Sequence, residues 1–138
     1  MARYKILPHT ADIRLKVYGE NLEALFRNAA LGLANVLYKD AEKKLKFARG
    51  AEKITVEADE TGVLLVNFLN QILSLSSINK RVYPKVRVLY FSPRKTEAQI
   101  SGFEISGFDE DVKAVSYHGV KIEGSKGGSF ETTVVLDV

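Results

Sequence analysis

Residues 21–37 read NLEALFRNAALGLANVL, and apolar side chains recur along them at intervals of three and four residues. This spacing builds one apolar stripe on a helix, and Asn21 can cap it by accepting a hydrogen bond from a first-turn amide. Gly32 interrupts the stripe at a cost of about 1 kcal/mol relative to alanine, so we expect a close helix–sheet contact there. The stripe consists of Leu22, Leu25, Phe26, Ala29, Leu33, Val36 and Leu37.

A strand precedes this helix, and a strand and a second helix follow it. Residues 13–18 alternate apolar and polar side chains, and residues 54–58 do the same, which is typical of half-buried strands. The charged residues 39–53 between them predict a solvated, irregular connection. Residues 63–78 are apolar on more than one stripe, with Thr61 as the cap and 79–81 as the end, which predicts the more buried of the two helices.

The rest of the chain is rich in predicted strands. The segments are 86–91, 98–108, 113–117, 120–123 and 130–136, and the glycine-rich residues 124–129 join the last two as a hairpin loop. With a further strand near residues 3–7, the order of elements predicts an α+β fold. We expect a two-layer sandwich with two helices packed on one face of a mixed β-sheet, as a single domain over residues 1–138.

The composition excludes several classes of site. The 138 residues contain no Cys, which excludes disulfide scaffolds, thiol nucleophiles, iron–sulfur clusters and thiolate zinc sites and fits a reducing compartment. His9 and His118 are the only histidines. No apolar run approaches the roughly 20 residues that a membrane span needs, and the N-terminus does not resemble a signal peptide. We therefore expect a cytoplasmic protein that does not enter a membrane.

The net charge of +3 conceals two segments of opposite sign. Residues 80–95 contain six basic and no acidic residues, whereas residues 97–138 contain eight acidic and three basic ones. Tyr83, Tyr90 and Phe91 lie among the cations, a mixture suited to phosphate contacts and base stacking. A solvated edge strand framed by Pro84 and Pro93 has the same composition. Contact with RNA, or with an acidic or RNA-bearing partner, and a merely solvated strand face both remain open.

Carboxylates occur at two distant places that strand pairing would bring together. Asp12 ends the segment Pro8-His9-Thr10-Ala11-Asp12, and Asp137 interrupts the last apolar strand beside the α-carboxylate of Val138. If the last strand pairs with residues 12–18, three carboxylates converge, and they repel one another unless a cation lies between them. Oxygen ligands suit Ca²⁺, Mg²⁺ or Mn²⁺ better than zinc. The alternative is a simple turn in which Thr10 and Asp12 satisfy backbone donors.

Three other groups of residues carry weaker signals. Ser116 and His118 share one strand face but lack the G-x-S-x-G motif, so a polar strand edge is favoured over hydrolysis. Residues 109–111 are three adjacent acids without the spacing of a calcium loop, which indicates a solvated turn. The glycine-rich residues 124–129 lack the phosphate-binding motif and a following helix. None of these groups predicts a site.

Four separated blocks of this sequence resemble the archease family. They are Pro8 to Ile13, the segment from Gly19 to Leu33, Val112 to His118 (VKAVSYH) and Val134 to Val138 (VVLDV). Two departures are mild, because Ser116 stands where the family commonly has Thr, and Phe130 stands where an aromatic residue, often Trp, is usual. The resemblance extends over the whole chain.

Archeases are small cofactors of the tRNA-splicing RNA ligase, which joins a 3′-phosphate or 2′,3′-cyclic phosphate end to a 5′-hydroxyl end. The resemblance implies a protein that promotes guanylylation and multiple turnover of this ligase, without enzymatic activity of its own. It implies a divalent-metal site at Asp12, Asp137 and the Val138 carboxylate, and a role for Lys113 and Glu131 in ligase activation. His9 and His118 would lie beside the metal ligands, and RNA or GTP would be contacted in the complex.

Two other functions compete with ligase activation. One is a metal-dependent phosphohydrolase or nuclease that uses Asp12, Asp137 and His9, although the chain has few candidate bases. The other is a small RNA-binding or chaperone-like module that uses the cations of residues 80–95.

Overall fold

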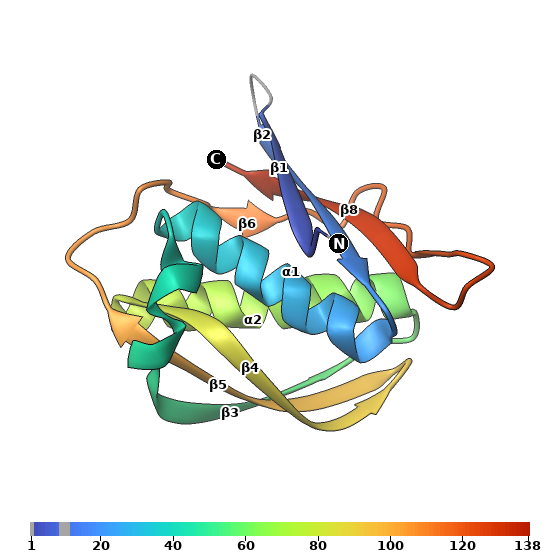
Figure 1. Ribbon diagram of the computed structural model, residues 1–138, viewed down its shortest axis with the longest axis horizontal. Helices are drawn as coiled ribbons and strands as arrows, with labels where there is room; N and C mark the ends of the chain where they lie inside the picture. The colour runs from blue at the N-terminus through green and yellow to red at the C-terminus, as the bar shows by residue number, and fades with distance from the viewer. Residues whose placement is uncertain (1, 9–11) are drawn as a thin grey trace.

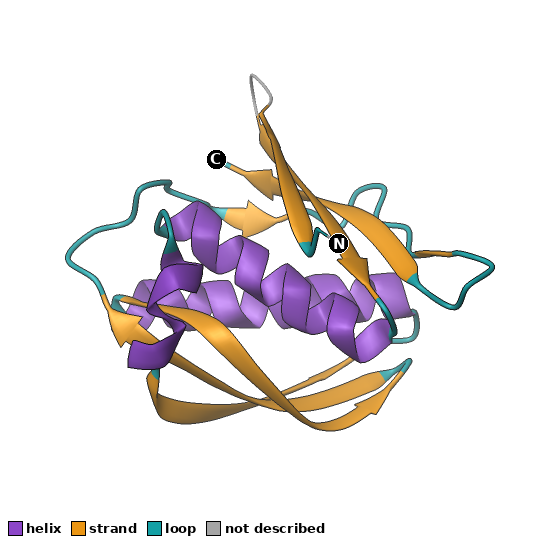
Figure 2. Cartoon of the chain, in the orientation of Figure 1, coloured by secondary structure: helices purple, strands orange, loops and turns teal. Residues whose placement is uncertain are grey.

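A computed structural model describes residues 2–8 and 12–138 and contains three layers (Figure 1). The helices lie between a five-stranded sheet on one side and a three-stranded sheet on the other (Figure 2). The elements in chain order are β1 (Tyr4–Pro8), β2 (Asp12–Gly19), α1 (Leu22–Leu37), the 3₁₀ helix η1 (Ala41–Phe47), β3 (Arg49–Glu57), α2 (Thr61–Asn79), β4 (Arg81–Ser92), β5 (Lys95–Glu104), β6 (Ala114–Val115), β7 (Glu123–Gly124) and β8 (Phe130–Asp137).

All strand pairs are antiparallel. The larger sheet has the order β1-β2-β8-β6, with β7 also paired to β8, and the smaller sheet has the order β3-β5-β4. The expected α+β class, with both helices packed against β-sheet, is confirmed. The expected two layers with one mixed sheet are replaced by three layers, because the strands form two antiparallel sheets on opposite sides of the helices (Figure 2).

The division into two sheets follows from the apolar surface of α1. Phe26 packs against Phe68 of α2 and Phe91 of β4, with ring centroids 5.5 Å and 5.0 Å away. Gly32 faces the other sheet, where an added Cβ would lie 2.8 Å from a methyl carbon of Leu15, so the predicted close helix–sheet contact is confirmed. A helix that is apolar on two sides needs a cover on each side.

The prediction that the second helix is the more buried one is wrong. Ten of the 16 residues of α1 are buried, against eight of the 19 residues of α2. Apolar residues near both ends of α2 lie outside the core, since Val63 is 37% and Ile78 72% exposed. Among the described helices, α2 alone is long and apolar enough to cross a membrane, but its buried residues belong to the core, as in a core helix.

The ends of the helices are set by local hydrogen bonds. Asn21 caps α1 as predicted, because its Oδ1 accepts from the amide of Ala24 at 2.8 Å. The predicted cap of α2 is displaced by one residue, since Glu60 holds the cap position and the Thr61 hydroxyl donates to the carbonyl of Pro93. Lys80 ends α2 in the left-handed conformation, with φ of 55°. The expected irregular connection 39–53 instead contains η1 and the first part of β3.

Candidate functional site

The outer face of the five-stranded sheet is the face turned away from the helices. Leu15, Val134 and Leu136 are fully buried on the inner face, so their alternating neighbours on β2 and β8 point outward. Asp12 and Asp137 are two of these outward residues. Both lie at the end of the sheet where β2 begins and β8 ends.

Asp12 and Asp137 are partners in the register of β2 and β8. The predicted pairing of the last strand with residues 12–18 is thus confirmed, and the two carboxylates occupy facing positions on adjacent strands. Asp12 is half-buried, whereas Asp137 and the following Val138 are exposed. Like charges directly opposite each other destabilise a sheet. A bound cation would relieve that repulsion.

The donor chemistry at this end of the sheet fits a hard divalent cation. Across the described part of the chain, no group of three or more His, Cys, Asp or Glu residues is placed to hold a metal. The two side-chain carboxylates that the structure places face to face here are those of Asp12 and Asp137. Mg²⁺ commonly keeps several waters, and Ca²⁺ accepts mixed carboxylate and water ligands.

Strand β6 brings Lys113 to the same end of the sheet. Ala114 is the register partner of Asp137, and the backbone amide of Lys113 donates to the Asp137 carbonyl at 2.7 Å. The Lys113 side chain is exposed. The structure therefore brings together Asp12, Asp137 and Lys113, three residues that are far apart in the sequence.

Asn70 of α2 supports this strand and was not singled out by sequence reasoning. Its Nδ2 donates to the carbonyl of Val115 at 3.0 Å, and its Oδ1 accepts from the amide of Val115 at 2.9 Å. Asn70 is one of several polar residues of this helix, so nothing in the sequence distinguished it from Asn67 or Gln71.

Glu131 lies away from these residues, at the other end of the outer face. It is the register partner of Tyr18, six residues before Asp137 on β8, and six residues of strand span roughly 20 Å. Its carboxylate lies 3.9 Å from the ammonium of Lys16. Glu131 and Asp137 are therefore separate parts of the outer face.

The structure describes one of the two histidines. His9, with Thr10 and Ala11, lies outside the described residues. His118 is exposed, and its backbone amide donates to the hydroxyl of Ser116 at 3.1 Å. Strand β6 ends at Val115, so the expected alternation does not continue to Ser116 and His118. The Ser116 hydroxyl serves the backbone of this turn, which gives no support to a hydrolytic Ser–His pair.

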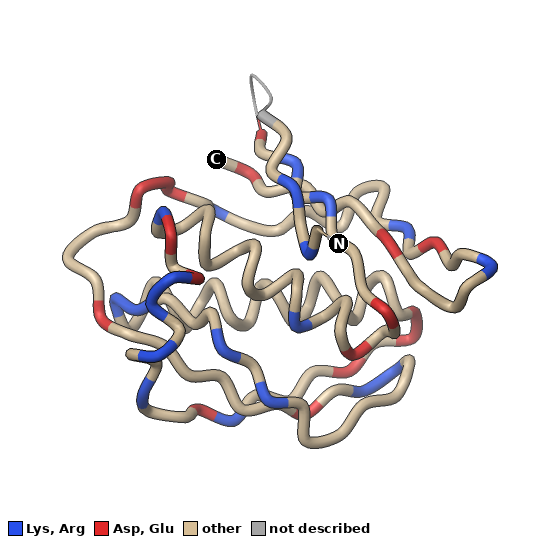
Figure 3. Tube along the Cα trace, in the orientation of Figure 1, with Lys and Arg blue, Asp and Glu red and all other residues tan. Residues whose placement is uncertain are grey.

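The cations of residues 80–95 lie on the other sheet, across the helical layer from Asp12 and Asp137 (Figure 3). Tyr83 is only 1% exposed, and Phe91 packs on Phe26, so neither ring is available for base stacking. The guanidinium of Arg81 donates to the carbonyls of Arg49 and Gly102. Only Tyr90 keeps the exposed aromatic character that the RNA-binding interpretation requires.

The acidic residues 109–111 and the glycine-rich residues 124–129 have structural roles. The amide of Lys39 donates to the Asp109 carboxylate at 2.6 Å, and the Asp109 amide donates to the carbonyl of Leu37, which ties the acidic turn to the end of α1. Residues 124–129 link β7 and β8, so the predicted hairpin loop is confirmed.

Comparisons with known proteins agree along the whole chain. The family model described as "Archease protein family (MTH1598/TM1083)" matches residues 4–138. The chain is 31% identical to protein archease of Methanosarcina mazei, over 99% of this chain and 96% of that protein. It is also 31% identical to protein archease of Thermococcus kodakarensis, over the full length of both.

Solved structures share the fold. The solution structure of Methanobacterium thermoautotrophicum protein 1598 matches with a TM-score of 0.78 and 25% identity over the full length of both chains. The crystal structure of an archease from Thermotoga maritima, described as a possible chaperone, matches with a TM-score of 0.62 and 19% identity. That match covers 97% of this chain and 96% of the other.

Proposed function

Because this chain belongs to the archease family, we propose that it is a protein cofactor that activates the RNA ligase of tRNA splicing in the cytoplasm. The ligase joins a 3′-phosphate or 2′,3′-cyclic phosphate end to a 5′-hydroxyl end, and the cofactor promotes its guanylylation and multiple turnover. The observation that carries the proposal is the family match over residues 4–138, which includes both strands that bear Asp12 and Asp137.

We assign the divalent-metal site to Asp12, Asp137 and the α-carboxylate of Val138. The facing positions of Asp12 and Asp137 support this assignment. A bound divalent cation would supply positive charge to phosphate oxygens. Both aspartates lie on paired strands, so the backbone fixes their separation before any ligand arrives.

Lys113 is the second chemical group of the proposed site. The hydrogen bond from its backbone amide to the Asp137 carbonyl holds the Lys113 backbone beside the carboxylates. Its side chain is exposed and is able to reach a partner. The ammonium would contact a phosphate or a ligase carboxylate. Acidic and basic groups side by side suit the surface of a nucleotide-handling enzyme, where phosphates and metal-binding carboxylates both occur.

One ligation assay tests the proposed function. The cognate ligase is supplied with a 3′-phosphate RNA and a 5′-hydroxyl RNA under multiple-turnover conditions, with and without this protein. The protein alone is assayed in parallel on RNA and on nucleotides. We expect faster turnover and faster ligase guanylylation only when both proteins are present. Turnover by this protein alone would instead identify a phosphohydrolase or nuclease, and salt-sensitive RNA binding without an effect on the ligase would identify an RNA-binding module.

A further inference from the structure

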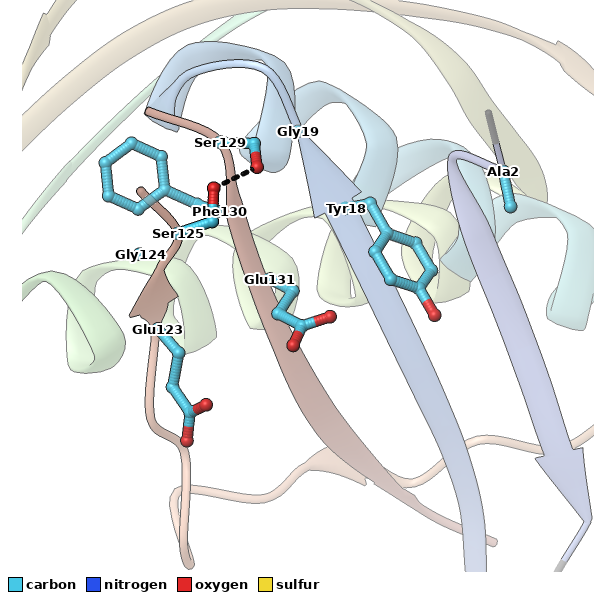
Figure 4. A pocket seen from close by; sticks show the side chains of 9 residues that line it. All are labelled: Ala2, Tyr18, Gly19, Glu123, Gly124, Ser125, Ser129, Phe130 and Glu131. Carbon is cyan, nitrogen blue, oxygen red and sulfur yellow. Dashed lines mark hydrogen bonds between the residues drawn. The ribbon is translucent and has the colours of Figure 1, made fainter. Parts of the chain in front are cut away.

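A pocket of about 400 Å³ lies at the Glu131 end of the outer face, away from Asp12 and Asp137 (Figure 4). Its walls come from the end of β2, from β7 and the start of β8, and from residue 2. This volume falls within the range of pockets that hold ligands. The pocket therefore has the size to receive a side chain from another molecule.

Two carboxylates and an aromatic ring form one row across this pocket. Glu131 is the register partner of Tyr18 on β2 and of Glu123 on β7, so the three side chains leave the sheet on the same face. Figure 4 shows Glu123 and Glu131 on neighbouring strands and the Tyr18 ring beside Glu131. The facing glutamates repel each other in the absence of a cation.

The pocket lining does not itself supply that cation. None of the described residues that line it is Lys or Arg. Lys16 forms an ion pair with Glu131 at 3.9 Å, and Lys16 and Lys121 line a neighbouring hollow that shares Glu123 and Glu131 with this pocket. Glu123 is exposed and makes no ion pair with the described residues. The residues that line the pocket thus carry two negative charges, and Lys16 pairs with the one on Glu131.

The remaining walls suit the flat, delocalised cation of an arginine. The Lys16 ammonium lies 5.6 Å from the centroid of the Tyr18 ring, so this ring already accepts a cation. Phe130 adds apolar surface for an aliphatic stem. The hydroxyls of Ser125 and Ser129 lie 2.6 Å apart, and the Ser125 amide donates to the Ser129 carbonyl. These contacts hold together the hairpin loop that forms one wall of the pocket. A guanidinium can stack on an aromatic ring and bond a carboxylate with two N–H groups.

We propose that this pocket receives an arginine side chain of the partner protein and anchors it to this end of the sheet. Two carboxylates repel nucleic-acid phosphates, which favours a protein partner. The identification of that partner as the RNA ligase rests on the proposed function. Docking and activation are then divided between the two ends of the sheet, with Glu123 and Tyr18 at the docking end and Asp12, Asp137 and Lys113 at the end proposed to act on the ligase.

The first test measures the affinity of the cognate ligase for Glu123→Gln. Calorimetric titration should give a dissociation constant raised roughly tenfold or more, because arginine anchors carry much of the affinity of an interface. Glu110→Gln removes the same charge from an exposed loop position outside the pocket and should bind like the wild type. Binding of Glu123→Gln within twofold of the wild type would overturn the proposal. Tyr18→Leu, which removes the stacking ring, provides a second variant.

The same experiment separates this proposal from the proposed function. If the wild type stimulates ligation while Glu123→Gln binds normally, only the pocket assignment fails. If the wild type neither binds nor stimulates the ligase, the proposed function fails. Raising the concentration of Glu123→Gln should restore stimulation, whereas Asp12→Ala should bind the ligase but not stimulate it at any concentration.

A second test needs no ligase. N-acetyl-arginine methylamide and its uncharged citrulline counterpart are titrated into the labelled protein, and the amide shifts of Gly124 and Ser125 are followed by NMR. We expect saturable shifts with the arginine compound only, and their loss in Glu123→Gln. Equal responses to both compounds would contradict an arginine pocket.

Discussion

The side-chain amide of Asn70 pairs with both backbone groups of Val115, donating to the carbonyl at 3.0 Å and accepting from the amide at 2.9 Å. Strand β6 consists of only Ala114–Val115 and pairs with β8. Asn70 supplies the hydrogen bonds that a further strand would supply. This contact links the buried helix α2 to the strand that begins immediately after Lys113.

Replacing Asn70 with alanine should therefore loosen β6. The change leaves both backbone groups of Val115 without their partners, and we expect a loss of about 1–3 kcal/mol in the free energy of unfolding. Urea denaturation measures this loss, and a multiple-turnover ligation assay should show weaker stimulation because Lys113 is less well placed. Gln71→Ala, at an exposed position of the same helix, is the matched control. Wild-type stability in Asn70→Ala would contradict the proposed support of β6.

Asp12→Ala should separate function from folding. We expect loss of ligase stimulation and at least tenfold weaker binding of Ca²⁺ or Mg²⁺ by titration calorimetry, because one of two facing carboxylates is removed. Asp12 lies at the end of a strand and outside the apolar core, so the variant should still fold, which urea denaturation checks. Asp111→Ala removes an exposed acid of the loop before β6 and serves as the control. Full stimulation by Asp12→Ala would refute the site assignment.

Extending the chain beyond Val138 tests the terminal ligand. A Gly-Ser extension turns the α-carboxylate into a neutral amide and moves the charge away from Asp137. We expect weaker metal binding, and its recovery when a protease removes the extension after Val138. Identical affinities before and after cleavage would show that the Val138 carboxylate is not a ligand.

Tyr83 predicts how stability depends on alkaline pH. Its buried hydroxyl donates to Glu52 at 2.6 Å and accepts from Asn79 at 2.9 Å. Burial raises the pKa of Tyr83 above its ordinary value of 10.0, and the hydrogen bond to Glu52 raises it further. The folded protein therefore retains a proton that the unfolded chain releases. The stabilisation is fully present below about pH 10 and is lost as the pH rises through the raised pKa.

Tyr83→Phe removes this titration. The variant should lose about 1–2 kcal/mol of unfolding free energy at neutral pH, because Glu52 and Asn79 lose a partner. Between pH 9 and 11 its stability should fall less steeply than that of the wild type. Urea denaturation at a series of pH values provides both curves, and parallel slopes would contradict the assignment.

The sequence predicted best those features that depend only on the position of a residue within its own helix or strand. Alternation predicted the strand that follows Asp12, and Asn21 marked the start of α1. The pairing of Asp12 with Asp137 was a hypothesis from the sequence, and the register of β2 and β8 confirms it. The alternating pattern also survives through β8, where every second residue is buried from Thr132 to Leu136.

Irregular backbone explains what the sequence did not predict. The register of β4 and β5 shifts between Val82 and Lys85, and Val82, Tyr83 and Pro84 are buried in succession. Such a bulge changes the direction of the side chains that follow it. Strict alternation therefore does not predict that Tyr83 is buried. The contact between Asn70 and Val115 joins residues 45 positions apart and leaves no local periodic signal.

The pairing of β2 with β8 also sets the order in which the protein can assemble. The helices and the three-stranded sheet lie between these two strands in the sequence, so they can associate before β8 has been synthesised. The five-stranded sheet has a high contact order, which slows its formation relative to local structure. During translation, Asp12 leaves the ribosome long before Asp137 does. The two carboxylates therefore come to face each other only in the last step of folding, when β8 pairs with β2.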